Sequence, residues 1–329
     1  MAPRRKAKVG NPETGEKETK TADSQSLVVA NEILDLFKES FSDTLSLDPP
    51  ELQERIQSVK TSLFDRNYME AFGSEENLEA YVVRWTPSRA LSYSHLFSSI
   101  TPIRDLLTES PASGQGETKR RVLSIGGGAG AEIVGVSSVS LLRNRSKEIN
   151  ENNRLSIDLL AVDVAKWDNV VNRLDGYVQK YWPQWGRMNG TSELEKDSPL
   201  SISFLNHDIL TISSAEIQLE TLDLITCMFT TNELFASSKA GTVKFLHSLS
   251  SCKPGALLLI VESAGSYSEI QIGSKTFPVQ FLIDHTLTSN KNWAIIDSED
   301  SRWYRVPDGL KYPLKLENMR FFFKLYRRL

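Results

Sequence analysis

This sequence of 329 residues lacks the features that mark several large protein classes. It has only two cysteines, Cys227 and Cys252, which excludes a disulfide framework and a cysteine-based zinc site. No apolar run reaches the roughly 18 residues of a membrane-spanning helix, and the N-terminus lacks the apolar stretch of a secretory signal. There is no internal repeat and no long low-complexity tract. We therefore expect an intracellular protein with reduced cysteines and no membrane span.

The composition that remains is that of an ordinary globular protein, with 40% hydrophobic and 24% charged residues. The net charge of −4 does not indicate a nucleic-acid partner. The charges are unevenly distributed, however, because residues 302–329 contain eight Lys or Arg and only two acidic residues. This basic end is compatible with contact to a polyanion, although a solvated charged surface would have the same composition.

The first third of the chain predicts a tail followed by helices. Residues 1–24 are polar and have too little apolar surface to order themselves. Their basic cluster from Arg4 to Lys8 suits a nuclear address, an RNA-tethering arm or a plain disordered tail. Residues 25–110 have apolar residues at helical spacing, and Pro87 should break one helix before another begins. Residues 111–119 predict a linker to a second domain, residues 120–329.

Short apolar runs alternate with helical stretches in this second domain. The runs that predict strands lie at about residues 122–125, 155–162, 201–205, 222–228, 256–261, 293–297 and 321–326. Continuous apolar strands that alternate with helices predict an α/β, Rossmann-like sheet that is mostly parallel and covered on both faces. The last two strands have no clear helix between them, which predicts an antiparallel pair at one edge.

The first strand leads into a glycine-rich turn, Ser-Ile-Gly-Gly-Gly-Ala-Gly. Gly126, Gly128 and Gly130 have the spacing G-x-G-x-G, with Gly127 inside it. Glycine tolerates a positive φ in a tight turn and lets the backbone approach a ligand closely. The turn lacks the G-K-[ST] ending of a P-loop, and the third position of the dinucleotide pattern falls on Ala131. A turn that only makes a tight connection is the alternative.

Polar side chains follow the next strands of the predicted sheet, where ligands bind in doubly wound folds. Asp163 ends the second strand, and a carboxylate there can accept both ribose hydroxyls. His207 and Asp208 end the third strand, where a carboxylate can accept from an adenine amino group. The fourth is followed by Phe-Thr-Thr-Asn-Glu. Each residue alone could be a cap or a turn former, but their order along the strands predicts a nucleoside site.

The spacing between the glycine turn and Asp163 is longer than is usual in nucleotide-binding folds. Gly130 and Asp163 are 33 positions apart, whereas the ribose-binding carboxylate usually lies about 20 residues past the glycines. The surplus fits a long polar loop at residues 144–154. If Asp163 does not lie at the strand end, its assignment to the ribose fails.

The motifs resemble those of class I S-adenosylmethionine-dependent methyltransferases over residues 120–329. They are Ser-Ile-Gly-Gly-Gly-Ala-Gly, Ala-Val-Asp, His-Asp-Ile-Leu, Met-Phe-Thr-Thr-Asn-Glu-Leu-Phe and Lys-Pro-Gly-Ala-Leu-Leu-Leu-Ile-Val-Glu. The fourth motif and the N-terminal Tyr-Val-Val-Arg-Trp-Thr-Pro are similar to fungal enzymes that methylate uridine N3 in large-subunit (25S) rRNA. The resemblance implies S-adenosylmethionine as cofactor, bound by Gly126, Gly127, Gly128, Gly130, Glu132, Asp163, His207, Asp208 and Phe229.

Uridine N3 must lose a proton, which calls for a base or a hydrogen-bonding group near the end of the fourth strand. Glu233 or His207 could take the proton, and Asn232 could hold the uracil carbonyls. The same segment also makes a good helix start. Methylation at C5, which generally needs a cysteine nucleophile, is disfavoured because Cys227 lies mid-strand and Cys252 is remote.

A base inside folded RNA must be splayed out or single-stranded before its N3 is exposed. Aromatic faces stack bases and guanidinium groups hold phosphates, so the helical region offers Tyr81, Arg84, Trp85, Arg89 and Tyr93 as substrate-binding candidates. Packing between the helices and the sheet explains Tyr81 and Trp85 equally well. The basic C-terminal end and the cluster at Arg4 to Lys8 could add backbone contacts.

The sequence therefore predicts an rRNA methyltransferase that forms 3-methyluridine in the large subunit. We expect a monomer that acts on rRNA or a pre-ribosomal particle in the nucleus or nucleolus, or also in the cytoplasm, without a metal ion. Two alternatives keep the fold. One is an inactive, methyltransferase-like ribosome-assembly or RNA-binding protein, and the other is a methyltransferase for a small molecule or a protein.

Overall fold

The computed structural model describes residues 24–109, 118–142, 155–183, 199–264, 269–272 and 275–329. Several predicted segments lie wholly or mostly outside these residues: the N-terminal tail with its basic cluster, the linker and the loop at 144–154. Two predicted boundaries are wrong by one or two residues. The first helix already begins at Ser24, and the first strand begins at Thr118, inside the expected linker.

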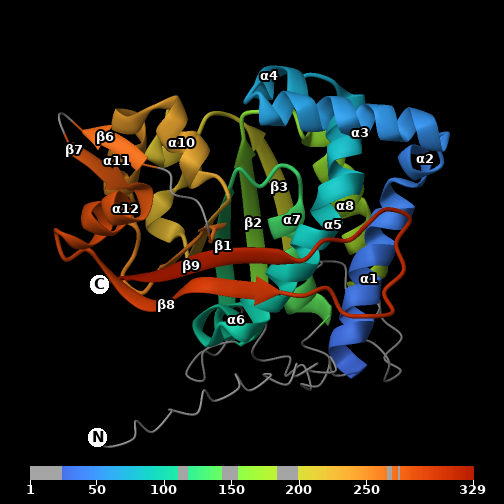
Figure 1. Ribbon diagram of the computed structural model, residues 1–329. Coiled ribbons are helices and arrows are strands. Elements are labelled where there is room, and N and C mark those ends of the chain that lie inside the picture. The colour runs from blue at the N-terminus through green and yellow to red at the C-terminus, as the bar shows by residue number, and fades with distance from the viewer. Residues whose placement is uncertain (1–23, 110–117, 143–154, 184–198, 265–268, 273–274) are drawn as a thin grey trace, which may run out of the picture.

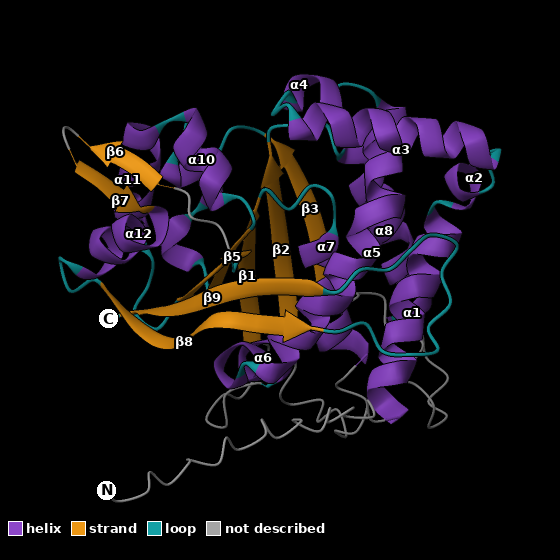
Figure 2. Ribbon diagram, in the orientation of Figure 1, coloured by secondary structure: helices purple, strands orange, loops and turns teal. Residues whose placement is uncertain are grey.

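A seven-stranded sheet forms the centre of the molecule, in the order β3-β2-β1-β4-β5-β9-β8 (Figures 1 and 2). The first five strands are parallel: β1 (Thr118–Ile125), β2 (Leu155–Asp163), β3 (Leu200–Asn206), β4 (Leu224–Met228) and β5 (Leu257–Ser263). Strand β9 (Met319–Arg328) runs antiparallel to both β5 and the edge strand β8 (Trp293–Tyr304). The predicted α/β class, the mostly parallel sheet and the antiparallel last strand are confirmed.

The central strands β4 and β5 are buried over almost their whole length, because each face of the sheet has its own hydrophobic core. In β5, Leu257, Leu259 and Val261 belong to one core, whereas Leu258 and Ile260 belong to the other. This alternation follows from the two-residue period of a strand.

The remaining elements after β1, besides the strands of the main sheet, are α7 (Ala131–Ser137), η1 (Ser138–Leu142), α8 (Asp168–Tyr181), α9 (Ser214–Ile217), η3 (Leu219–Thr221), α10 (Thr231–Ser237), α11 (Lys239–Ser248), η4 (Leu249–Ser251), the hairpin β6 (Glu269–Ile272) and β7 (Lys275–Pro278), and α12 (Val279–Thr288).

The N-terminal helices complete one of these two cores. They are α1 (Ser24–Ser40), α2 (Ser42–Leu45), α3 (Pro49–Phe64), α4 (Tyr68–Ala71), α5 (Glu75–Ser99) and α6 (Thr101–Thr108). Phe37 of α1, Val59 of α3 and Leu96 of α5 pack in the same cluster as Leu259 of the sheet. Arg173 of α8 adds polar links, since it donates to the carbonyl of Ser40 and to Glu79, each at 2.6 Å. Among the described residues, no helix is long and apolar enough to cross a membrane.

The prediction that Pro87 breaks a helix is wrong, because α5 continues through it from Glu75 to Ser99. Proline has no N–H and cannot donate to the carbonyl of Val83 four residues earlier, which normally weakens the helix there. In this fold the hydroxyl of Tyr312 donates to the carbonyl oxygen of Val83 at 2.9 Å. The segment between β8 and β9 therefore satisfies the acceptor that Pro87 leaves open.

Candidate active site

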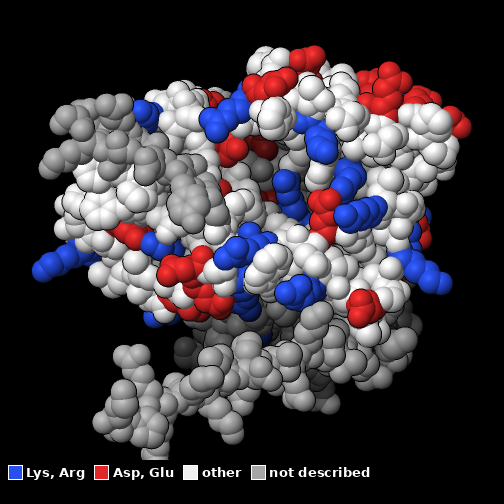
Figure 3. Space-filling model, viewed as in Figure 1, with Lys and Arg blue, Asp and Glu red and all other residues white. Residues whose placement is uncertain are grey.

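The carboxyl ends of the parallel strands meet at one edge of the sheet, between α10 on one side and the N-terminal helices on the other (Figure 1). Figure 3 shows a hollow in the surface at this place, with acidic side chains in its wall and basic side chains beside it. The predicted glycine turn follows β1 here, and Asp163, Phe229 and Glu262 lie at or just past the ends of β2, β4 and β5. The site expected at the strand ends is therefore assembled by the sheet.

The glycine turn is constrained by the protein itself. Gly126 and Gly130 have φ angles of 71° and 89°, in the left-handed region that favours glycine. A Cβ on Gly128 would lie 2.0 Å from Cδ1 of Trp167, and one on Gly126 would lie 2.5 Å from Oγ1 of Thr230. Glycine is thus needed for the backbone conformation and for close packing, in addition to the ligand approach that the sequence suggested.

Asp163 lies at the end of β2, so the condition for its predicted role is met despite the long spacing. Its Oδ2 accepts from the backbone N–H of Gly128 at 3.2 Å, and its Oδ1 accepts from that of Ala165 at 3.1 Å. Burial raises the pKa of Asp163, although these hydrogen bonds oppose the shift. The carboxylate therefore fixes the glycine turn against β2.

His207 and Asp208 follow β3, directly beside β2. The backbone N–H of His207 donates to the carbonyl of Asp163 at 2.9 Å, and Oδ1 of Asp208 accepts from Leu210 N at 2.9 Å. These residues are thus well placed next to Asp163. Three strand spacings, about 14 Å, separate β3 from β4. His207 is consequently far from Glu233 and from the place where a base is needed.

Phe229, just past β4, has a strained backbone. Its φ of 58° is uncommon for a residue with a side chain, and such outliers cluster at functional sites. The conformation is held by a hydrogen bond from Phe229 N to the carbonyl of Val261 at 2.7 Å. The ring stacks on Tyr93, with centroids 6.4 Å apart and planes 15° apart. Phe229 therefore turns the chain sharply between β4 and α10.

Glu262, near the end of β5, is a site residue that the sequence interpretation missed. It is only 4% exposed, and its carboxylate accepts from Thr231 Oγ1, from Asn232 N at 3.3 Å and from Asn232 Nδ2 at 3.0 Å. Burial raises the pKa of Glu262 to about 7, with a further contribution from the nearby charge of Glu233. The sequence did contain an indication of this position, because Glu262 is an acidic residue that directly follows an uninterrupted apolar run.

Glu233 lies in the first turn of α10 and has an incompletely satisfied carboxylate. Its Oε1 accepts from the hydroxyl of Tyr68 at 3.3 Å, whereas its buried Oε2 has no hydrogen-bond partner among the described residues. Burial raises the pKa of Glu233, and the charges of Arg89 and Arg66 oppose this only in part. Tyr68 belongs to α4, so the N-terminal helices reach the site through a residue that the sequence did not single out.

Glu132 and Arg89 interact electrostatically with the other charged residues at the strand ends. We call the group of Glu132, Asp163, Glu233 and Glu262 the acidic site. Glu132, in the first turn of α7, is buried, which raises its pKa to about 8 against the opposing charge of Arg89. Arg89 interacts electrostatically with both Glu132 and Glu233 and donates a hydrogen bond to the hydroxyl of Tyr81. Arg89 therefore faces the acidic site, and its predicted contact with substrate would have to be made there.

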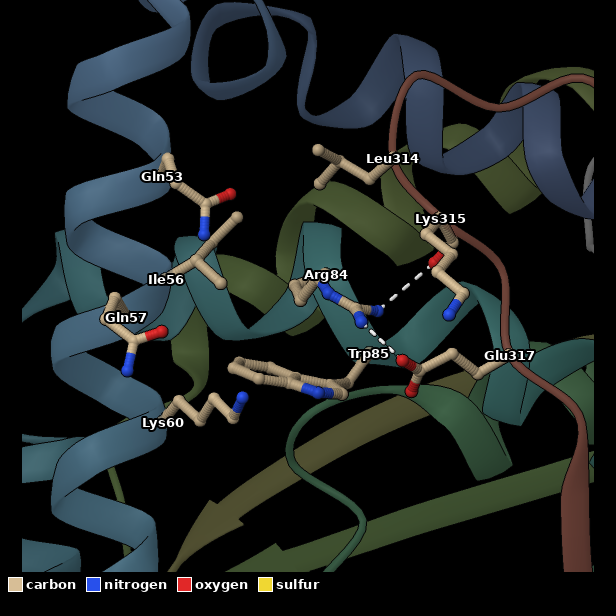
Figure 4. A pocket seen from close by; sticks show the side chains of 9 residues that line it. All are labelled: Gln53, Ile56, Gln57, Lys60, Arg84, Trp85, Leu314, Lys315 and Glu317. Atoms are coloured by element: carbon tan, nitrogen blue, oxygen red, sulfur yellow. Dashed lines mark hydrogen bonds and ion pairs between the residues drawn. The ribbon is translucent and has the colours of Figure 1, made fainter.

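The other predicted substrate residues divide into two groups. Tyr81 and Tyr93 are only 8% and 2% exposed, and the ring of Tyr81 packs against those of Phe72, Trp85 and Trp167. This packing leaves neither tyrosine ring a free face on which a base could stack. Arg84 and Trp85 line a separate cavity between α3 and α5 (Figure 4). The five candidates therefore do not form one surface.

The strand order, the antiparallel last strand, the glycine turn and the carboxylate that ends β2 together define a Rossmann-like methyltransferase. The comparison with protein families agrees. A family model described as SAM-dependent methyltransferase matches residues 37–327, and the chain belongs to this family.

Among curated proteins, the chain is similar to the 25S rRNA (uridine(2843)-N(3))-methyltransferase of Saccharomyces cerevisiae. The identity is 37% and covers 92% of this chain and 87% of the yeast protein. Two solved structures illustrate more distant likenesses. A SAM-dependent methyltransferase from Aquifex aeolicus is 18% identical with a TM-score of 0.31, over 73% of this chain and 98% of that one. A 16S rRNA (adenine(1408)-N(1))-methyltransferase mutant from Catenulisporales acidiphilia is 16% identical with a TM-score of 0.34, over 64% and 88%.

The cofactor of this family, S-adenosylmethionine, suits the groups that the structure gathers here. It carries a positive sulfonium and a positive ammonium group, and four carboxylates surround the site: Glu132, Asp163, Glu233 and Glu262. Oε2 of Glu233, which has no hydrogen-bond partner in the part of the chain that the structure describes, can accept a further hydrogen bond. Arg89, on the same cluster, is a suitable partner for the ligand's carboxylate. The residues present therefore fit the cofactor.

Proposed function

We propose that this protein methylates N3 of a uridine in large-subunit ribosomal RNA. The observation that carries the proposal is the 37% identity, across 92% of the chain, to a yeast enzyme named for that activity. The cofactor contacts predicted from the sequence belong to the proposal, with Asp163 on the ribose and Asp208 on the adenine. The intact glycine turn and the carboxylates around it weigh against an inactive protein.

For this reaction the protein must hold the uracil and accept the proton of N3. S-adenosylmethionine supplies a methyl group that is already activated, so positioning and proton transfer remain for the protein. Glu233 is the better candidate for the base, since burial raises its pKa above the usual value of a carboxyl group and its Oε2 has no hydrogen-bond partner among the described residues. His207 is three strands away from Glu233.

Asn232 would act beside Glu233. Its Nδ2 donates to Glu262 at 3.0 Å, and the predicted contact with a uracil carbonyl would be made by the same amide. Glu262 then has the role of a positioning residue that orients Asn232. The two cysteines are unsuited to nucleophilic chemistry, because burial raises the pKa of Cys227 and of Cys252, the latter to about 12.

Two surfaces outside the acidic site suit the RNA. In the basic C-terminal part, Trp303 is 52% exposed and lies beneath the guanidinium groups of Arg305 and Arg320, 5.1 and 5.7 Å from the ring centroid. Exposed aromatic rings and guanidinium groups are the groups that bind single-stranded RNA. The helical region 25–110 would serve as the substrate-binding part over the domain 120–329. We expect a monomer without a metal ion, in the nucleus, the nucleolus or also the cytoplasm.

Methylation of RNA by the purified protein tests the proposal. Labelled S-adenosylmethionine and deproteinised large-subunit rRNA should give labelled 3-methyluridine, identified by mass spectrometry of the nucleosides.

Glu233→Gln should reduce the rate by about 100-fold or more while calorimetry still detects cofactor binding. In the wild type the rate should fall as the pH is lowered, because the base must be ionised. Label in another nucleoside or in protein would contradict the proposal.

A further inference from the structure

A cavity of about 410 Å³ lies outside the acidic site and is used by none of the chemistry above. It opens between α3, α5 and the segment that joins β8 to β9 (Figure 4). Helix α3 contributes one wall, the segment before β9 contributes the other, and Trp85 of α5 lies between them. Its lining residues are Gln53, Ile56, Gln57, Lys60, Arg84, Trp85, Leu314, Lys315 and Glu317.

The wall formed by the β8–β9 segment is fixed to α5 by hydrogen bonds at successive positions. Arg84 donates to the carbonyl of Lys315 at 3.1 Å and pairs with Glu317 at 2.5 Å. The backbone N–H of Glu317 donates to Ser88 Oγ at 2.9 Å. The cavity is therefore built into the fold and does not depend on a loop that must close over a ligand.

The chemistry of the lining matches that of a nucleotide. The indole of Trp85 is only partly buried and lies in the cavity (Figure 4), with the Arg84 guanidinium 5.6 Å from its ring centroid. Its neighbour Tyr81 is buried. The ammonium groups of Lys60 and Lys315 border the same space, and neither has an ion-pair partner among the described residues. The amides of Gln53 and Gln57 can both donate and accept hydrogen bonds. An aromatic face, two ammonium groups and two amides suit a base, a phosphate and the polar edge of a base.

Side chains of α5 link the cavity to the acidic site. Trp85 packs on Tyr81 with ring centroids 5.2 Å apart, and the hydroxyl of Tyr81 accepts a hydrogen bond from Arg89. Arg89 in turn interacts electrostatically with Glu233. Tyr81 and Arg89 therefore lie between Trp85 of the cavity and Glu233 of the acidic site.

We propose that this cavity holds a nucleotide that neighbours the methylated uridine in single-stranded substrate RNA. Its base would stack on Trp85, and its phosphates would contact Lys60 and Lys315. The identification of the ligand as part of the substrate rests on the proposed function. A free nucleotide has the same chemistry, and the experiment distinguishes these two sources.

Fluorescence anisotropy of a labelled, uridine-containing single-stranded RNA of about 12 nucleotides tests the proposal in the full-length protein. Trp85→Ala should weaken binding about tenfold or more, and Trp85→Phe, which keeps a stacking face, should restore most of it. Lys60→Ala and Lys315→Ala should each weaken binding several-fold and make its salt dependence shallower. Lys244→Ala, an exposed lysine on α11, is the matched control and should bind as the wild type does.

Cofactor affinity by calorimetry and the thermal midpoint by circular dichroism show whether a variant is still folded. Unchanged RNA affinity in folded Trp85→Ala and Lys60→Ala would overturn the proposal, as would uridine monophosphate binding as tightly as the RNA. These readouts do not depend on methylation. Absence of 3-methyluridine with RNA binding that still requires Trp85 would refute the proposed reaction and keep the cavity as an RNA site.

Discussion

Single residues at the glycine turn are held by contacts that a sequence pattern does not reveal. The pattern indicated that Gly128 lets a ligand approach, but the structure places the indole of Trp167 where a Cβ would be. Trp167 is itself buried, so the ring cannot easily move aside. The turn is therefore shaped by protein packing before any cofactor binds.

We expect Gly128→Ala to destabilise the fold by about 1–3 kcal/mol, because the new methyl group would lie 2.0 Å from Cδ1 of Trp167. Urea unfolding followed by circular dichroism measures the change. Gly176→Ala is the control, since nothing lies within 4 Å of its Cβ position in α8. That variant should gain about 0.5–1 kcal/mol from helix propensity. Equal effects of the two substitutions would contradict a role for packing against Trp167.

Site residues that directly follow a strand could be predicted from the sequence. Site residues that other elements contribute through the tertiary fold could not. Asp163 could be placed because a carboxylate directly after an apolar strand, in this order of motifs, is typical of the ligand-binding edge of a parallel sheet. Glu262 also follows an apolar strand. It is the last residue of the motif Lys-Pro-Gly-Ala-Leu-Leu-Leu-Ile-Val-Glu, which was interpreted only as a strand. Tyr68 carries no signal of its own, since only the fold brings α4 to within hydrogen-bonding distance of Glu233.

At the level of elements, the continuity of α5 depends on a partner more than 200 residues away. A proline in a helical pattern predicts a break because the preceding turn loses a donor. Tyr312 supplies that donor to Val83. Local rules could not predict the uninterrupted helix, because the compensating hydroxyl comes from the segment between β8 and β9.

Tyr312→Phe should cost about 1–3 kcal/mol of unfolding free energy, because it leaves the carbonyl of Val83 without a donor. The cost should shrink in a Pro87→Ala background, where the new N–H of residue 87 can donate to Val83. A double-mutant cycle by urea unfolding gives the coupling, expected at about 1 kcal/mol. Additive effects would show that the two residues act independently.

At the scale of the whole molecule, the predicted division at residues 111–119 does not coincide with a division of the core. The element types and the sheet were predictable from apolar periodicity and motif order. The docking of the helices was not, because Phe37, Val59 and Leu96 would suit the interior of a separate helical domain equally well. In the structure they share one hydrophobic cluster with Leu259 of β5.

We therefore expect the helices and the sheet to unfold together. Differential scanning calorimetry should give one transition, with a calorimetric enthalpy equal to the van't Hoff enthalpy. The shared core is the reason, since neither part can lose its partner without exposing apolar surface. Two separable transitions, one of them assigned to residues 25–110, would instead establish an independent helical domain.

The position of β9 has a consequence for synthesis of the chain. Residues 319–328 follow the other strands of this sheet in the sequence, yet they lie between β5 and β8 and fill the place beside the apolar strand β5. A ribosome thus delivers the five parallel strands and all six N-terminal helices while β5 still has an open edge and Val83 still lacks Tyr312. Open edges of this kind recruit other chains. The nascent protein is therefore exposed to aggregation between the synthesis of β5 and that of β9, and a chaperone would protect it best by covering β5 during this interval.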